Sequence, residues 1–193
     1  MMKMLSLKSV LIISDSRTFS DNIKLILPPD EFEISFASNG SEARRLIVTR
    51  HFDILVINAP LSDEHGLSFA LDFIDSTMGI LMICPDSIYE GLSYEAEEAG
   101  IVLLTSSNPP AFIYVALKMI ASMIKRLETL EHKNKILSDK MADFRIVNKA
   151  KWALIEKKQM TEGEAHKYIE KRAMDHRISS KDAAEEILDL LGE

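Results

Sequence analysis

The sequence lacks the features of an exported or membrane-spanning protein. Its 193 residues contain a single cysteine, Cys84, which excludes an internal disulfide framework and is compatible with a reducing compartment. No apolar run approaches the ~20 residues that a membrane-spanning helix requires. The first nine residues include lysines but no long apolar core and no small-residue cleavage site. We therefore expect a cytoplasmic protein without membrane association.

Residue patterns typical of enzymes are also missing. The sequence contains no glycine-rich phosphate loop and no Ser-His-Asp arrangement. His166 and His176 are too far apart, and too isolated from cysteines or a pattern of acidic ligands, to predict a zinc site. We expect no enzymatic activity, no metal and no cofactor.

Positive charge is scarce in the first part of the chain and concentrated near its end. Residues 1–118 contain eight lysines and arginines against sixteen aspartates and glutamates, a net charge of −8. Residues 145–181 contain ten basic against five acidic residues, a net charge of +5, and residues 182–193 then contain five acidic and no basic residues. This asymmetry makes the tail the candidate for binding a polyanion. Charge alone, however, favours an ordinary solvated helix surface.

Short apolar runs alternate with amphipathic segments through the first 110 residues. The runs are typical of strands buried on both faces, and they are expected at residues 10–13, 33–36, 54–57, 80–83 and 101–104. Helices are expected between them, at residues 16–27, 41–50, 67–75 and 88–99. Five strands alternating with helices predict an α/β fold with a doubly wound, five-stranded parallel sheet of the flavodoxin type, which we assign to residues 1–115.

A long helical pattern follows Pro109 and Pro110. Apolar residues recur at alternating steps of three and four from Ile113 to Phe144, as in a coiled coil. Asn134 occupies an a position, where a buried asparagine selects parallel pairing of two chains. Ile113 to Ile120 could instead pack on the first domain. We assign residues 116–144 to a homodimerisation helix, whose seam consists of Leu127, Leu130, Asn134, Leu137 and Met141.

The remaining residues, 145–193, have the pattern of a small bundle of three short helices. Thr161 and Glu164 fit a capping box at the start of the middle helix, and Ser179 or Ser180 is expected to cap the last one. The middle helix carries small residues such as Ala165 and Ala173 on one face, which lets helices approach closely.

Several positions in residues 8–120 resemble the receiver domain of two-component response regulators. In that family two acidic residues end the first strand, and an aspartate that accepts phosphate ends the third. The corresponding residues here are Ser14-Asp15 and Asn58, which precedes Gly66 by eight positions. The resemblance also implies a hydroxyl residue where Cys84 stands and a lysine in the loop occupied by residues 105–109.

These departures predict a pseudo-receiver that is not switched by aspartyl phosphorylation. A carboxamide such as that of Asn58 lacks the anionic oxygens that form an acyl phosphate. Magnesium requires several hard oxygen ligands, and Asp15 alone is a poor start for such a site. Asp53, Asp63 and Glu64 are nearby in sequence, but surface charge and turn formation explain them better.

The tail resembles the ANTAR module, an RNA-binding antitermination domain found behind receiver domains. The matching residues are Ala150-Lys151, Ala165, Tyr168, the run Lys171 to Asp175, Arg177, Ala184 and Ile187. Trp152 replaces the glycine that usually follows Ala-Lys. The resemblance implies a dimer that binds paired stem-loops in a leader RNA and thereby prevents a terminator hairpin from forming.

Within this module, basic side chains are the candidates for contact with RNA phosphates. We expect these contacts from Lys151, Lys167, Lys171, Arg172 and Arg177. Tyr168 and Trp152 could stack on a loop base or pack in the bundle. The spacing of Tyr168 from Ala165 and Ile169 favours the bundle, whereas the sequence leaves Trp152 open.

Two functions from different classes are consistent with these patterns. The first is a signal-responsive transcription antiterminator that binds leader-RNA stem-loops as a homodimer. The alternative is an adaptor whose pseudo-receiver and tail bind a sensor, a ligand-binding protein or another protein partner. A DNA-binding factor is a weaker interpretation, because the tail has no recognisable helix-turn-helix.

Overall fold

The computed structural model describes residues 7–192 of the chain. It divides into two compact units, the first ending at Glu128 and the second beginning at Thr129. Helix α5, Pro110–Lys158, contributes residues to both units. No helix among the described residues is both long enough and apolar enough to cross a membrane.

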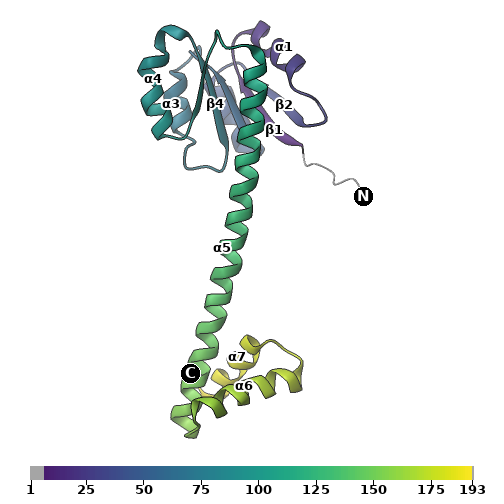
Figure 1. The fold of residues 1–193 in the computed structure, drawn as a ribbon, viewed down its shortest axis with the longest axis vertical. Helices are drawn as coiled ribbons and strands as arrows, with labels where there is room; N and C mark the ends of the chain where they lie inside the picture. The colour runs from purple at the N-terminus through teal and green to yellow at the C-terminus, as the bar shows by residue number, and fades with distance from the viewer. Residues whose placement is uncertain (1–6, 193) are drawn as a thin grey trace. The chain divides into compact units, whose positions relative to one another are not determined.

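The first unit is built on a five-stranded sheet (Figure 1). All neighbouring strands are parallel, and their order is β2-β1-β3-β4-β5. The strands are β1 (Lys8–Ile13), β2 (Phe32–Ala37), β3 (Ile54–Asn58), β4 (Gly79–Cys84) and β5 (Val102–Thr105). The helices between them are α1 (Arg17–Ile26), α2 (Gly40–Thr49), α3 (Gly66–Leu71) and α4 (Asp86–Glu98). The doubly wound parallel sheet expected from the sequence is therefore confirmed.

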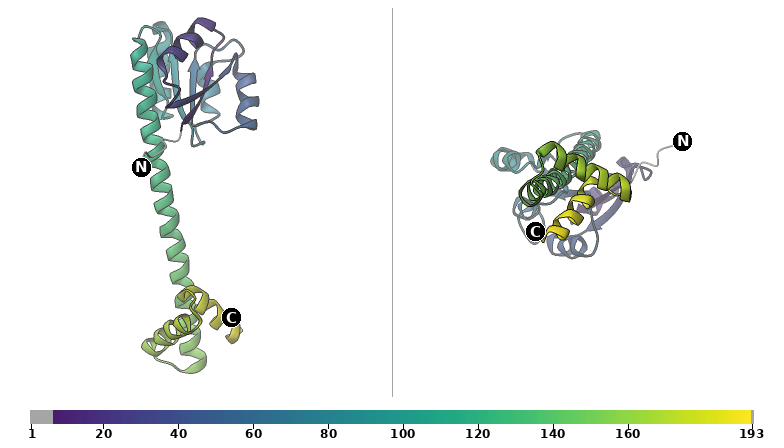
Figure 2. Two further views of the ribbon diagram at one scale, coloured as in Figure 1. Left: turned by 90° about the vertical axis from the view of Figure 1, so that its right-hand side faces the viewer. Right: turned by 90° about the horizontal axis from the view of Figure 1, so that it is seen from below.

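Each face of this sheet is covered by its own hydrophobic core. Because successive side chains of a strand point to opposite faces, Leu11 and Ile13 face one core while Val10 and Ile12 face the other. The first core is closed by α2, α3 and α4, and the second by α1 and α5. Figure 2 shows the sheet between α5 on one side and α2 on the other. This sandwich fixes the carboxyl ends of β1, β3 and β4 along one edge, which is where the receiver-like residues lie.

The first turns of α5 belong to the sheet's second core. Ile113, Ala116 and Ile120 are at most 9% exposed and pack there, so these early members of the heptad pattern are not available for pairing. Gly79 allows this close approach, because a Cβ atom at that position would overlap the Ile120 side chain. The packing of this segment on its own domain, which the sequence had left open, is the arrangement found.

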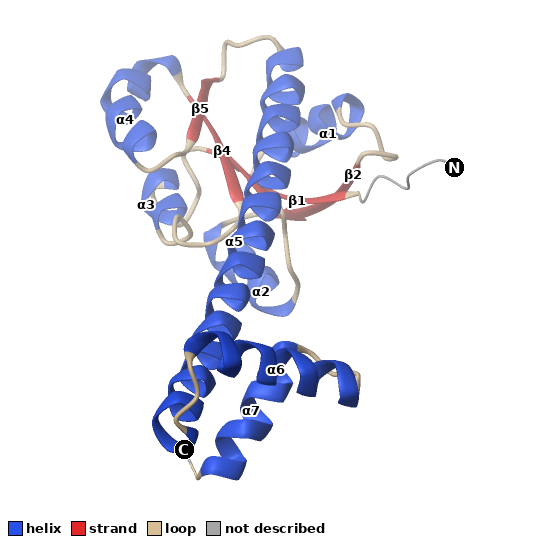
Figure 3. Ribbon diagram, turned by 60° about the horizontal axis from the view of Figure 1, so that its bottom comes forward, coloured by secondary structure: helices blue, strands red, loops and turns tan. Residues whose placement is uncertain are grey.

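The second unit is a three-helix bundle formed by the end of α5 with α6 (Glu162–His176) and α7 (Ser180–Leu191) (Figure 3). The bundle is confirmed, but its first helix is not a separate short helix. α5 continues unbroken to Lys158, and Gln159 then adopts a positive φ of 55°. Its core consists mainly of alanines with a few larger side chains, including Leu154, Ile169 and Ile187. Small side chains allow the three helices to pack closely.

Both capping expectations for the bundle are confirmed. The Thr161 hydroxyl accepts a hydrogen bond from the backbone N–H of Glu164, and the Glu164 carboxylate accepts one from the backbone N–H of Thr161. The backbone N–H and the hydroxyl of Thr161 both donate to the Glu164 carboxylate, which lowers the pKa of that carboxyl below its ordinary value. Ser179, rather than Ser180, caps α7 through a second capping box with Asp182. These caps satisfy the first backbone N–H groups of α6 and α7 and fix where each helix begins.

Candidate functional site

The carboxyl edge of the receiver sheet places the two predicted degenerate positions side by side. The amide nitrogen of Asn58, at the end of β3, donates a hydrogen bond to the Ser14 hydroxyl at 2.9 Å. The backbone N–H of Ser16 donates to the same hydroxyl at 3.1 Å. Ser14 is only 7% exposed, whereas the neighbouring Asp15 is exposed. Two uncharged groups therefore occupy the positions at which the resemblance to the receiver family implies carboxylates.

The other side of this edge is closed by hydroxyl and amide groups. Cys84 ends β4 and is fully buried, and burial together with the charge of Asp86 raises the pKa of its thiol. After β5, the Asn108 side chain accepts the backbone N–H of Thr105 at 2.8 Å. The Ser107 hydroxyl donates to Asp86 at 2.6 Å, and this bond is the main reason that the pKa of Asp86 is lowered. Hydrogen bonds from uncharged donors therefore hold the loop after β5 in place, and this loop contains no lysine.

The nearby carboxylates are engaged in holding the fold. Asp53 accepts a hydrogen bond from the backbone N–H of Ser9 at 2.7 Å and forms an ion pair with Lys8 at 2.9 Å. Asp63 accepts the first backbone N–H groups of α2, from Gly40 and Ser41, at 2.9 Å each, which lowers the pKa of its carboxyl.

Glu64 pairs with Arg44 on α2, so both acids in the loop after β3 tie that loop to one helix. No group of three or more His, Cys, Asp or Glu residues is arranged to hold a metal in the described chain. Asp15 and Asp86 are the carboxylates described at this edge, and Asp86 is bound by Ser107, so the donor set does not fit Mg²⁺.

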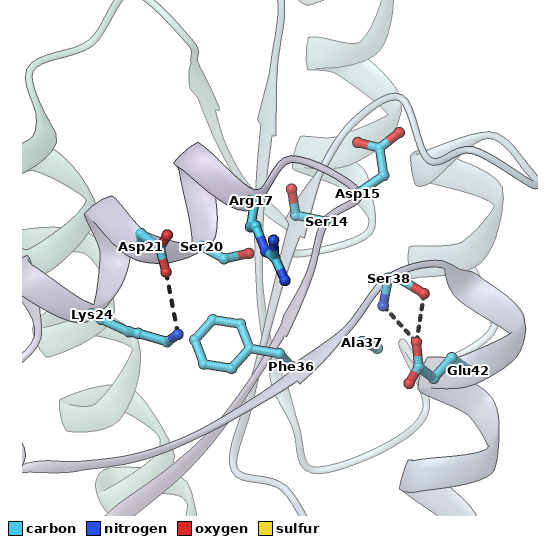
Figure 4. Close-up of a pocket in the computed structure, with 10 residues that line it drawn as sticks. All are labelled: Ser14, Asp15, Arg17, Ser20, Asp21, Lys24, Phe36, Ala37, Ser38 and Glu42. Carbon is cyan, nitrogen blue, oxygen red and sulfur yellow. Dashed lines mark hydrogen bonds and ion pairs between the residues drawn. The ribbon is translucent and has the colours of Figure 1, made fainter.

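A shallow groove of about 550 Å³ opens beside Ser14 (Figure 4). Arg17 and Lys24 reach it from α1, and Phe36 and Ser38 from β2 and the loop that follows. The Lys24 ammonium lies 4.6 Å from the centre of the Phe36 ring and pairs with Asp21 at 3.3 Å. The groove therefore presents both signs of charge.

Two of the five predicted RNA contacts form ion pairs that join helices of the bundle. Lys151 on α5 pairs with Glu162 on α6 at 3.2 Å. Arg172 on α6 pairs with Glu186 on α7 at 2.9 Å. Both basic side chains are less than one-quarter exposed. Their positions at helix junctions give them a structural role within the bundle.

The other three predicted contacts are exposed. Lys167 and Lys171 lie one turn apart on α6, on the face opposite the buried Ala165 and Ile169. Arg177 ends α6 in the left-handed conformation, with φ of 58°. None of these three side chains has an ion pair among the residues that the structure describes. We call these three exposed cations, two on α6 and one at its C-terminal end, the α6 basic face.

The two aromatic candidates differ in their surroundings. Tyr168 is half-buried against the bundle core, with the Lys158 ammonium 5.1 Å from its ring centre. Trp152 is 71% exposed and does not belong to that core. The question that the sequence left open is thus answered as far as packing is concerned: Trp152 does not fill the bundle.

Sequence reasoning missed two basic residues on the same side of α5 as Trp152. Arg145 and Lys149 are exposed and have no ion pair in the described part of the chain. They precede Trp152 by seven and three residues, a spacing that places all three on one helical face. That spacing can be seen in the sequence, but the sequence does not show which face of α5 the other two helices of the bundle cover.

The predicted dimer seam lies on an uncovered face of α5. Leu127, Leu130, Leu137 and Met141 are each 55–59% exposed, and Asn134 is exposed among them. A row of large apolar side chains in water is unfavourable, at roughly 25 cal/mol per Å² of apolar surface.

Comparisons with known proteins agree with both units. The family model of the ANTAR domain matches residues 136–188. The transcriptional regulatory protein PdtaR of Mycobacterium tuberculosis is 25% identical over 187 residues, which cover 96% of this chain and 91% of that protein.

Among solved structures, the first unit resembles a CheY-like receiver domain protein from Methanospirillum hungatei JF-1. That likeness has a TM-score of 0.56 at 21% identity and covers 63% of this chain and 98% of the other. The signal receiver domain of an HD domain-containing protein from Pseudomonas fluorescens Pf-5 gives 0.60 at 14% identity, over 67% and 97% of the two chains. These likenesses establish the fold of the first unit.

Proposed function

We propose that this chain, which carries an ANTAR domain at residues 136–188 behind a domain of receiver fold, is a signal-responsive transcription antiterminator that binds leader-RNA stem-loops. The observation that supports this most strongly is the α6 basic face. Lys167, Lys171 and Arg177 point away from the bundle core with no acidic partner among the described residues. Free cations on a rigid helix are suited to phosphate contacts, which supply much of the affinity for RNA.

Lys151 and Arg172 belong to the same proposed interface, at its edge. Their partners, Glu162 and Glu186, hold the two cations at the junctions of the three helices. A phosphate can take the place of either carboxylate, because guanidinium and ammonium groups bind both. Replacing Lys151 and Arg172 with alanine is expected to abolish RNA binding while leaving the helical content intact.

The proposed active form is a homodimer. A second α5 helix would cover the row from Leu127 to Met141 and pair the two Asn134 side chains in register. Two copies of the α6 basic face would then be presented together, as binding to a pair of stem-loops requires.

The receiver unit is proposed to act without aspartyl phosphorylation. The hydrogen bond between Asn58 and Ser14 joins two neutral groups where an acyl phosphate and a metal site would need carboxylates. Control must then come through another input, such as a sensor or ligand-binding protein that binds the receiver unit.

The direct test is a gel shift with two-hairpin leader RNA from the protein's own genome, with duplex DNA for comparison. The double variant Lys167→Ala/Lys171→Ala should weaken RNA binding at least about tenfold, through the loss of two phosphate contacts. Arg17→Ala/Lys24→Ala removes the same charge from the receiver unit and should bind as the unaltered protein does. If the alternative adaptor function holds, pulldown from cells recovers protein partners but no RNA, and neither double variant changes an RNA shift.

A further inference from the structure

We propose that a second face of the bundle contacts RNA, formed on α5 by Arg145, Asn148, Lys149 and Trp152, with the Trp152 indole as a stacking platform for one unpaired base. The inference rests on the proposed function and adds to it a specific aromatic contact. We call these four residues the α5 tryptophan face.

The α5 tryptophan face is a single continuous surface. Its residues follow the spacing i, i+3, i+4 and i+7, which places them side by side on two turns of a helix. The buried residues of the same turns, Ala150 and Leu154, point to α6 and α7 instead. Those two helices lie on one side of the end of α5, which leaves its other side open (Figure 3).

Trp152 contributes nothing to closing the bundle. The core around it is filled by alanines and by Leu154, and the indole remains 71% exposed. A tryptophan is the largest aromatic surface available to a protein, and stacking a base on such a surface contributes about 1–3 kcal/mol. The exposed Trp152 indole is therefore available to contact a binding partner.

The charges on this face favour a polyanion. Arg145 and Lys149 have no ion pair in the described chain, unlike Lys151, which Glu162 holds. Asn148, half-buried between them, offers both a donor and an acceptor to a base edge. Glu156, one turn beyond Trp152, is exposed and marks the end of the positive surface.

A second copy of the chain is the competing occupant, and the heptad pattern argues against it. After Phe144 the next two seam positions are Asn148 and Lys151, so the apolar seam ends before Trp152 is reached. Arg145 and Trp152 occupy e positions, which flank a seam rather than fill it. A dimer that pairs through Leu127 to Met141 therefore has Asn148 in line with its seam, while Arg145 and Trp152 lie beside the seam, where RNA can reach them.

The experiment uses Trp152 as its own reporter, because it is the one tryptophan among the 193 residues. Its emission in the full-length protein is followed during titration with synthetic two-hairpin RNA carrying randomised loop bases. The same stems without loops serve as the fully paired control. Binding affinity is measured in parallel for Trp152→Ala, Trp152→Phe and Leu190→Ala. Leu190 is a matched control, since it is a large apolar side chain, 70% exposed, on α7.

Stacking predicts that looped RNA quenches the emission and that fully paired RNA quenches it less. Trp152→Ala should weaken binding of looped RNA by about 5- to 150-fold, which corresponds to the stacking free energy of about 1–3 kcal/mol. Trp152→Phe should retain most of the affinity, and Leu190→Ala all of it.

Other outcomes overturn the inference in distinguishable ways. If looped RNA binds but emission and the affinity of Trp152→Ala are unchanged, the stacking contact is wrong and the proposed function stands. If the Trp152 emission shifts when the protein is diluted without RNA, and Trp152→Ala self-associates more weakly, the face binds a second copy of the chain instead of RNA. If the unaltered protein binds no looped RNA, both the stacking contact and the proposed function fail.

Discussion

At the scale of single residues, Asn58 determines what the edge of the receiver sheet can do. Its amide donates to Ser14, and the buried hydroxyl is satisfied by this bond and by the N–H of Ser16. The arrangement is stable without a cation, because neither partner carries a charge. A carboxylate in either place would carry a charge that the neutral pair of Asn58 and Ser14 does not have.

We therefore expect acetyl phosphate with Mg²⁺ to leave the intact mass of the protein unchanged. A phosphoryl group adds about 80 Da, which mass spectrometry resolves easily. A receiver domain that retains its aspartate, treated in parallel, shows that the reagent is active. A stable increase of this size that maps to the peptide containing Asn58 and Asp63 would contradict the account.

The positions of these residues in the sequence predicted the edge but not its bonds. The resemblance to the receiver family implied that Ser14 and Asn58 belong to one site. The ion pairs of Lys151 and Arg172 were not foreseen, since their partners are 11 and 14 residues away on other helices. Helix packing decides such pairs, and the sequence pattern gives no register for it.

At the scale of single elements, α5 has two different faces along its first turns. Its buried side packs on the sheet through Ile113, Leu117 and Ile120, and Gly79 leaves the space for Ile120. The heptad pattern includes Ile113 and Ile120, and the sequence left open whether they pair with a second chain or pack on the first domain. Their burial shows that they pack on the sheet, because an apolar residue at a seam spacing can face either a second helix or a hydrophobic core.

Gly79→Ala tests this packing. The added methyl group would collide with Ile120, so we expect a loss of about 1–3 kcal/mol in the free energy of unfolding of the receiver unit. Urea denaturation followed by far-UV circular dichroism measures the change. Gly91→Ala in α4 is the control, because a Cβ there meets no atom within 4 Å and alanine favours the helix by about 0.5–1 kcal/mol. If the two variants had equal midpoints of urea denaturation, α5 would not pack closely against Gly79.

The free part of α5 offers a second test. Leu130→Lys/Leu137→Lys places charges in the proposed seam of both copies and should weaken dimerisation at least about 100-fold, since each buried leucine contributes about 1.5–3 kcal/mol. Analytical ultracentrifugation gives the dissociation constant. Ile136→Lys is the matched control: it is exposed beside Leu137 but off the seam spacing. A dimer that survives the double variant, or is lost equally in the control, rules out this seam.

At the scale of the whole molecule, charge is divided between the two units. Residues 1–128 carry a net charge of −7, whereas residues 129–193 contain thirteen basic and thirteen acidic residues and expose cations on α5 and α6. A polyanion is therefore repelled by the receiver unit, and in the bundle only the exposed cations can attract it. Under the proposed function, RNA binds the bundle and the receiver unit stays available to bind a protein partner.

The salt dependence of RNA binding measures how many phosphates the bundle contacts. We expect the logarithm of affinity to fall linearly with the logarithm of salt concentration, with a slope that becomes shallower by about one to two in Lys167→Ala/Lys171→Ala. Fluorescence anisotropy with labelled two-hairpin RNA at several salt concentrations provides the slope. An unchanged slope would remove these lysines from the phosphate contacts, even if affinity falls.

The central claim is that the bundle binds paired stem-loops in leader transcripts. Crosslinking in cells followed by sequencing of the bound RNA tests it most directly, with the Lys167→Ala/Lys171→Ala variant as the matched control. The account predicts reads concentrated on two-hairpin elements that overlap a terminator, and their loss in the variant. Reads spread evenly over transcripts, or equal recovery with the variant, would contradict it.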